Sequence, residues 1–197
     1  MGAKLVHGIW PALCTAFDDS GAHVDTARQR ALVRALIGTG IQGFFVCGST
    51  GEGRVMTAVP NFAGFKFTDN DLYLFGQLID RSDGELNAIS GPDQMALPAM
   101  VMGADAAIGT TYNIMPGRYL QMRRAFEDGD LAVARDCQLK ANRVIRLLIE
   151  VGVLPAVKQV LADRGTPVGP TRVVPPLDEA GILALHAGLE QLNFEVH

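Results

Sequence analysis

The sequence predicts an α/β fold in which strands and helices alternate around a parallel sheet. Two observations indicate this fold. Up to residue 115, short apolar runs alternate with amphipathic stretches, and most of the apolar runs end in small or polar residues. From residue 116 onward the apolar residues recur mainly at helical spacing. We therefore expect one domain over residues 1–197, with strand-helix repeats in 1–115 and a mainly helical part in 116–197.

Five strands are predicted in the first part of the chain, together with the helices that connect them. The strands cover residues 9–13, 42–47, a run ending near Lys66, 86–89 and 104–108. Asp25 can cap a helix over 26–38, which Gly38 and Gly40 end. Further helices are predicted near 71–80 and 93–101, and then at 117–127, 130–150, 154–163 and from Asp178, after the Pro-rich connector 167–176. We expect the last four helices to pack outside the sheet.

The composition is that of an ordinary globular protein. Of 197 residues, 48% are hydrophobic and 19% charged, and the net charge is −4 without a basic cluster, so we expect no nucleic-acid partner. No apolar stretch approaches the ~18 residues of a spanning helix, and the N-terminus lacks the apolar core of a signal peptide. We therefore expect a cytoplasmic protein with no membrane partner. The three cysteines are widely separated and lack metal-ligand spacing, so no metal is expected.

Small and polar residues follow four of the predicted strands. These segments are Gly48-Ser49-Thr50, Lys66-Phe67-Thr68, Gly91-Pro92-Asp93 and Gly109-Thr110-Thr111. Alternating strands and helices allow either an open sheet or a barrel. Because the carboxyl ends of barrel strands open toward one pocket, this pattern favours a barrel.

Lys66 is the candidate catalytic residue. Phe65 and Phe67 place it on an apolar strand, where desolvation favours the neutral, nucleophilic amine. Such an amine can form an imine with a 2-keto acid, and the protonated imine draws the electrons of a breaking carbon–carbon bond. The alternative interpretation is a strand-end lysine that only reaches solvent.

The Gly-rich loop 48–53 is the candidate binding site for the acid group. Its consecutive backbone N–H groups and the hydroxyls of Ser49 and Thr50 can bind a carboxylate. Such a loop is most often just a turn, but its position before Lys66 favours the binding interpretation.

These motifs resemble those of the N-acetylneuraminate lyase and dihydrodipicolinate synthase family, class I Schiff-base aldolases on a TIM barrel. The likeness is carried by residues 8–12 with Thr15, 48–53, 64–68, 109–113, 153–158 and 169–172. Lys66-Phe67-Thr68-Asp69 is more similar to the sialic acid lyases than to the synthases.

The resemblance implies a reaction and a set of site residues. The reaction is the reversible cleavage of a sialic acid to pyruvate and N-acetylmannosamine through a Schiff base on Lys66, without a cofactor, in a homo-oligomer. The implied contacts to the sugar acid are Thr68, Gly91, Asp93 and Thr110, with Gln94 where the lyases often carry Glu. The alternative for Gly91-Pro92-Asp93 is a turn in which Asp93 caps a helix, and both roles can coexist.

The sequence departs from the family between the second strand and Lys66. Only the fourteen residues 48–61 lie there, where the family places further strand-helix units. Three missing units of about 30 residues each leave an incomplete barrel of about five of eight strands. The missing part includes the family's catalytic tyrosine, and the context of that residue is not found around Tyr73, Tyr112 or Tyr119.

Two alternative functions stay open at this point. A shortened family member can be catalytically impaired and act as a binding or assembly protein for pyruvate or a sugar acid. A lyase or synthase for another 2-keto acid is the second alternative.

Overall fold

The computed structural model describes residues 8–20, 24–44, 64–84 and 86–194. Its strands are β1 (Gly8–Pro11), β2 (Gly64–Phe67), β3 (Asn87–Ser90) and β4 (Ala106–Gly109). Its helices are α1 (Thr26–Ile37), α2 (Leu72–Arg81), α3 (Ala96–Val101), α4 (Pro116–Glu127), α5 (Leu131–Val151), α6 (Val153–Asp163) and α7 (Glu179–Gln191), with short 3-10 helices η1 (Asp93–Met95) and η2 (Thr111–Asn113). Most of these elements agree with the predicted ones to within a few residues.

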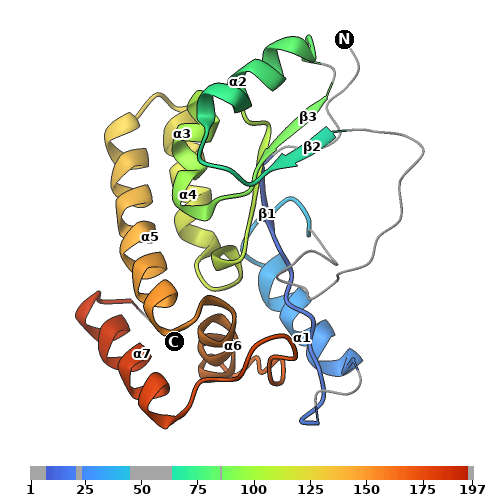
Figure 1. Ribbon diagram of the computed structural model, residues 1–197, viewed down its shortest axis with the longest axis vertical. Coiled ribbons are helices and arrows are strands. Elements are labelled where there is room, and N and C mark those ends of the chain that lie inside the picture. The colour runs from blue at the N-terminus through green and yellow to red at the C-terminus, as the bar shows by residue number, and fades with distance from the viewer. Residues whose placement is uncertain (1–7, 21–23, 45–63, 85, 195–197) are drawn as a thin grey trace.

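The four described strands form one parallel sheet in the order β1-β4-β3-β2. Figure 1 shows β2 beside β3 at one side of this sheet. Ile9 of β1 lies opposite Ala107 of β4, and Lys66 of β2 lies opposite Ile89 of β3. The first described strand thus pairs with the last, as it does where a strand-helix series curls round into a barrel. The prediction of a parallel sheet from an incomplete barrel is confirmed.

The strand predicted over 42–47 falls partly outside the described residues. Its described part, 42–44, has no regular secondary structure. Gln42 nevertheless lies along β1, because its backbone N–H donates to the Ile9 carbonyl (3.3 Å) and its Oε1 accepts from the Ile9 N–H (2.7 Å). The chain after α1 therefore returns along the edge of β1 that β4 does not occupy.

Side chains alternate between the two faces of the sheet, and this alternation decides where Lys66 points. Phe65 and Phe67 pack toward Phe75 of α2, and the rings of Phe67 and Phe75 are stacked with their centroids 5.2 Å apart. Lys66 stands between the two phenylalanines, so its side chain leaves the opposite face of β2. In a closed barrel that face is the interior.

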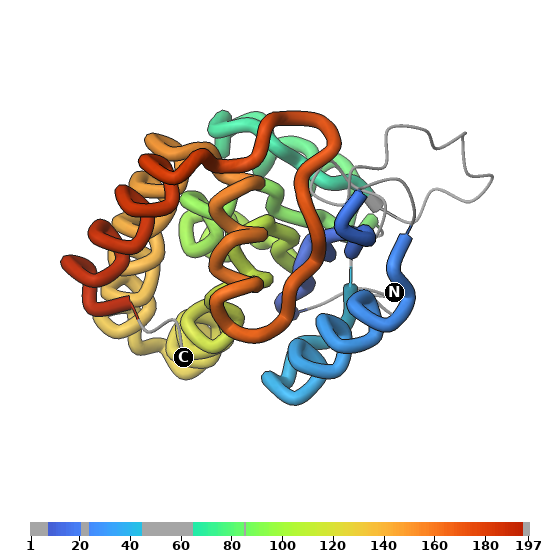
Figure 2. The backbone as a smooth tube through the Cα atoms, turned by 90° about the horizontal axis from the view of Figure 1, so that it is seen from below, coloured from blue at the N-terminus to red at the C-terminus, as the bar shows by residue number. Residues whose placement is uncertain are grey.

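The helices after β4 form a layer outside the sheet. The main contacts of α5 are with α4, α3, α6, α7 and η1. Figure 2 shows α7 beside α5, on the opposite side of the molecule from α1. Ile9 and Ala107 of the sheet share one core with buried residues of these helices, such as Leu148 and Leu185.

None of the described helices combines the length and the apolar character that a membrane crossing requires.

Candidate active site

Lys66, Thr68 and Gly91 meet where β2 and β3 end. The Cε of Lys66 lies 2.9 Å, and the Oγ1 of Thr68 2.4 Å, from the point that a Cβ on Gly91 would occupy. The Gly91 N–H donates to the Phe67 carbonyl (2.8 Å), which extends the pairing of the two strands. The glycine therefore leaves room for the amine-bearing side chain to cross the end of β3.

The environment of Lys66 favours the neutral amine. Although the side chain is exposed overall, partial burial of its amine lowers the pKa of Lys66 below its ordinary value of 10.5. The negative charge of Asp93 acts in the opposite direction on this pKa. A larger share of Lys66 than of a fully solvated lysine is consequently nucleophilic near neutral pH.

Asp93 is buried and bonded within the protein. Its Oδ2 accepts hydrogen bonds from the backbone N–H and the Oγ1 of Thr111, both at 2.7 Å. Its Oδ1 lies 2.0 Å from the point where a Cβ on Gly109 would stand. Burial raises the pKa of the Asp93 carboxyl, while the hydrogen bonds from Thr111 and the charge of Lys66 lower it by a smaller amount.

The alternative prediction, that Asp93 caps a helix, is wrong. Pro92 stands at the N-cap position of η1, and no side chain makes a capping hydrogen bond there. Asp93 lies inside η1 and reaches across to the end of β4 instead.

The remaining predicted site residues differ in their exposure, and two of them lie outside the described residues. Thr110 directly follows β4 and is half-buried. Gln94 is exposed, and the Nδ2 of Asn142 on α5 donates to its backbone carbonyl (3.3 Å). Ser49 and Thr50 lie outside the described residues, so the predicted carboxylate site stays a prediction.

Sequence reasoning did not assign a role to Thr111, Tyr119 or Gln138, the side chains around Asp93. Thr111 directly follows the predicted contact Thr110, and that adjacency was a usable signal. Tyr119 and Gln138 come from α4 and α5, far along the chain, and their burial (0% and 5% exposed) depends on packing that the sequence pattern does not reveal.

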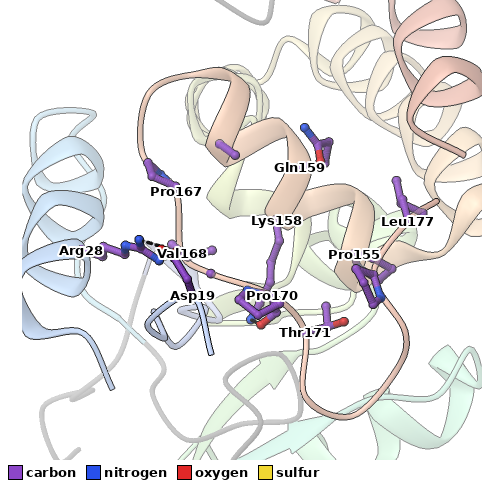
Figure 3. Close-up of a pocket in the computed structure, with 13 residues that line it drawn as sticks. Asp19, Arg28, Pro155, Lys158, Gln159, Pro167, Val168, Pro170, Thr171 and Leu177 are labelled. Atoms are coloured by element: carbon purple, nitrogen blue, oxygen red, sulfur yellow. Dashed lines mark hydrogen bonds and ion pairs between the residues drawn. The ribbon is translucent and has the colours of Figure 1, made fainter. Parts of the chain in front are cut away.

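A separate cavity of about 310 Å³ lies between α6, residues 167–177 and the start of α1 (Figure 3). Lys158 extends across it from α6 and donates to the Pro170 carbonyl (2.9 Å), with its Nζ 5.1 Å from the centre of the Phe17 ring. Of the predicted site residues that the structure describes, none lines this cavity. Within the described ranges, His, Cys, Asp and Glu form no group of three or more that could hold a metal ion.

The sequence is similar to those of known proteins along most of its length. A model of the dihydrodipicolinate synthetase family matches residues 5–59 and 53–192. N-acetylneuraminate lyase of Mus musculus is 38% identical over 129 residues, which cover 64% of this chain and 40% of that protein. The enzyme of the same name from Rhizobium meliloti is 39% identical over 127 residues, 64% of this chain and 42% of that protein.

A solved structure shows the same fold. The N-acetylneuraminate lyase of Aliivibrio salmonicida superposes with a TM-score of 0.87 at 19% identity, over 96% of this chain and 98% of that chain. The chain itself spans only about two fifths of the length of the first two curated relatives. The two stretches matched by the family model meet at residues 53–59, inside the segment where the sequence predicts missing barrel units.

Proposed function

Because the chain belongs to the dihydrodipicolinate synthetase family, we propose that it binds a 2-keto acid covalently through Lys66. The proposed reaction is the reversible cleavage of N-acetylneuraminate to pyruvate and N-acetylmannosamine. The observation that carries this proposal is the position of Lys66, whose side chain crosses Gly91 beside Thr68 at the strand ends. The names of the similar curated proteins support the choice of substrate.

The proposed chemistry begins with attack of the neutral Lys66 amine on the C2 carbonyl of the keto acid. Loss of water gives an imine, which is protonated on nitrogen. The electron pair of the C3–C4 bond then moves toward the protonated imine, while the C4 hydroxyl gives up its proton and becomes the aldehyde. Protonation of the resulting enamine at C3 and hydrolysis release pyruvate and free Lys66.

The proposed reaction needs a general base that takes the proton of the C4 hydroxyl, and none of the three tyrosines is suited to this role. The phenols of Tyr112 and Tyr119 are buried, and burial raises the pKa of each well above 10. Tyr73 lies exposed on α2, where its hydroxyl accepts from Gln77 (2.9 Å). Loss of a general base lowers rates by about 10²–10⁴, so we propose imine formation with slow cleavage.

The other site residues have roles by resemblance. We propose that Ser49 and Thr50 bind the carboxylate, and that Thr68, Gly91, Gln94 and Thr110 line the path of the sugar-acid hydroxyls. The resemblance implies the same role for Asp93, but its Oδ2 is bonded to Thr111, and we do not include it in this set.

Borohydride trapping with pyruvate, followed by assay of N-acetylneuraminate cleavage, tests this function. Lys66→Ala abolishes the trapped adduct, whereas Lys140→Ala, which removes an exposed lysine paired with Asp136 on α5, retains it. Adduct without measurable cleavage favours the alternative of an impaired pyruvate-binding protein, which the short span of the chain also supports. If the folded wild-type protein forms no adduct, the covalent mechanism is wrong.

A further inference from the structure

Polar side chains from three separate elements converge on Asp93. Thr111 of η2 donates twice to its carboxylate, each time at 2.7 Å. The hydroxyl of Tyr119 on α4 lies 2.9 Å from the Oγ1 of Thr111 and 3.5 Å from the Asp93 carbonyl. Gln138 on α5 donates from Nε2 to that same carbonyl (3.2 Å).

Two side chains of helix α5 form hydrogen bonds to the segment after β3 at three of its residues. Besides its bond to the Asp93 carbonyl, Gln138 accepts from the backbone N–H of Leu97 through Oε1 (2.8 Å). That N–H lies in the first turn of α3, where backbone donors have no partner inside the helix. One turn further along α5, Asn142 donates to the Gln94 carbonyl (3.3 Å). A single helix thus anchors residues 93–97.

Because these polar groups are buried, losing one of their hydrogen bonds costs free energy. Thr111, Tyr119 and Gln138 are 2%, 0% and 5% exposed, so each polar group loses its water and depends on its protein partners. A satisfied buried network holds one arrangement of the elements that it joins. Gly109 belongs to the same arrangement, because a side chain there would collide with the Asp93 carboxylate.

We propose that Asp93, Tyr119 and Gln138 are positioning residues that anchor the 91–97 segment to helices α4 and α5. The Asp93 carboxylate then serves to bind Thr111 and does not contact the sugar hydroxyls directly. The anchored segment carries Gly91 and Gln94 at the site of the proposed function, on which this inference rests. Lys66 itself lies on β2, whose pairing with β3 does not use the side chains of Asp93, Tyr119 or Gln138.

Loss of the anchoring contacts should therefore change the KM for N-acetylneuraminate but not the formation of the pyruvate adduct on Lys66. Tyr119→Phe and Gln138→Leu each raise the KM for N-acetylneuraminate about fivefold or more, the effect of losing at least one hydrogen bond, while the yield of pyruvate adduct stays within about twofold. Tyr73→Phe and Gln191→Leu are the matched controls, since both side chains are exposed on other helices, and they leave both quantities unchanged.

Asp93 itself is tested by its conservative variant. In Asp93→Asn the side-chain oxygen can still accept both bonds from Thr111, so this variant keeps the wild-type KM, whereas Asp93→Ala does not. If Asp93 instead binds the sugar directly, Asp93→Asn raises KM as well, and the inference is overturned.

Amide hydrogen exchange provides a readout that does not require turnover. We expect the N–H of Leu97 to exchange at least tenfold faster in Gln138→Leu, and that of Thr111 in Asp93→Ala, with α6 unchanged. Unchanged exchange at both amides overturns the anchoring. A wild-type protein that forms no pyruvate adduct refutes the proposed function, and the exchange result then decides the anchoring by itself.

Discussion

The Cε of Lys66 lies 2.9 Å from the point that a Cβ on Gly91 would occupy, so the side chain of one residue uses the space that the other leaves empty. Two further atoms lie close to the same point. The Oγ1 of Thr68 and the carbonyl of Phe67 lie 2.4 and 2.9 Å from the same point. A methyl group at residue 91 has to displace one of these neighbours.

We predict that Gly91→Ala lowers the rate of pyruvate adduct formation at least about tenfold, because small displacements of a reacting group are costly. Gly117→Ala is the control, since apart from its chain neighbours and the adjacent backbone of α4 no described atom lies within 4 Å of a Cβ there. Residue 117 is in α4, where alanine stabilises a helix by up to about 1 kcal/mol relative to glycine. Wild-type adduct formation in Gly91→Ala contradicts the close contact with Lys66.

The lowered pKa of Lys66 predicts a specific pH dependence. Labelling by an amine-selective reagent between about pH 7 and 11 should follow the neutral amine, with a midpoint below the ordinary value of 10.5. Because the charge of Asp93 raises the pKa of Lys66, the midpoint should fall further in Asp93→Asn. Peptide mapping by mass spectrometry identifies the labelled lysine, and a midpoint at or above 10.5 rejects partial burial of the amine.

The raised pKa of Asp93 predicts how the free energy of unfolding of the wild-type protein changes with pH relative to that of Asp93→Asn. Its folded-state pKa is raised above the ordinary 3.8, so its contribution to stability is complete below pH 3.8 and is lost as the pH rises through the folded value. The asparagine does not titrate. We expect the free energy of unfolding of wild type, minus that of Asp93→Asn, to fall in urea titrations as the pH rises above 3.8. A rising difference contradicts the direction of this shift.

The C-terminal helices are predicted to stabilise the same core as the sheet. Leu148 of α5 is fully buried, and Leu148→Ala should lower the free energy of unfolding by about 2–5 kcal/mol. Leu139 lies on the same helix but is 51% exposed, so Leu139→Ala should change it by less than about 1 kcal/mol. Similar urea midpoints for the two variants would show that α5 is not part of the core.

Local patterns were sufficient to predict much of this fold. The strand around Lys66 and the helix capped by Asp25, whose Oδ1 accepts from the N–H groups of Ala27 and Arg28, follow from residues that are close in the sequence. The structure also agrees with the predicted meeting of Lys66, Thr68 and Gly91, because the carboxyl ends of parallel strands lie at one edge.

Contacts between distant residues were not predictable in the same way. Asp93 was assigned to a helix cap or to a sugar hydroxyl, and its bonds to Thr111 depend on the pairing of β3 with β4. Gln138 reaches Asp93 across 45 positions, and no local spacing indicates which glutamine of a helix will be buried. Polar networks of this kind need the tertiary packing before they can be identified.

The most direct test of the covalent mechanism is to locate the pyruvate adduct. After incubation with pyruvate and borohydride, the protein is digested and each of its four lysines, Lys4, Lys66, Lys140 and Lys158, is checked for the reduced adduct by mass spectrometry. We predict modification at Lys66, with the adduct lost in Lys66→Ala and retained in Lys140→Ala. Equal modification of several lysines, or none in the folded protein, would contradict a Schiff-base site at Lys66.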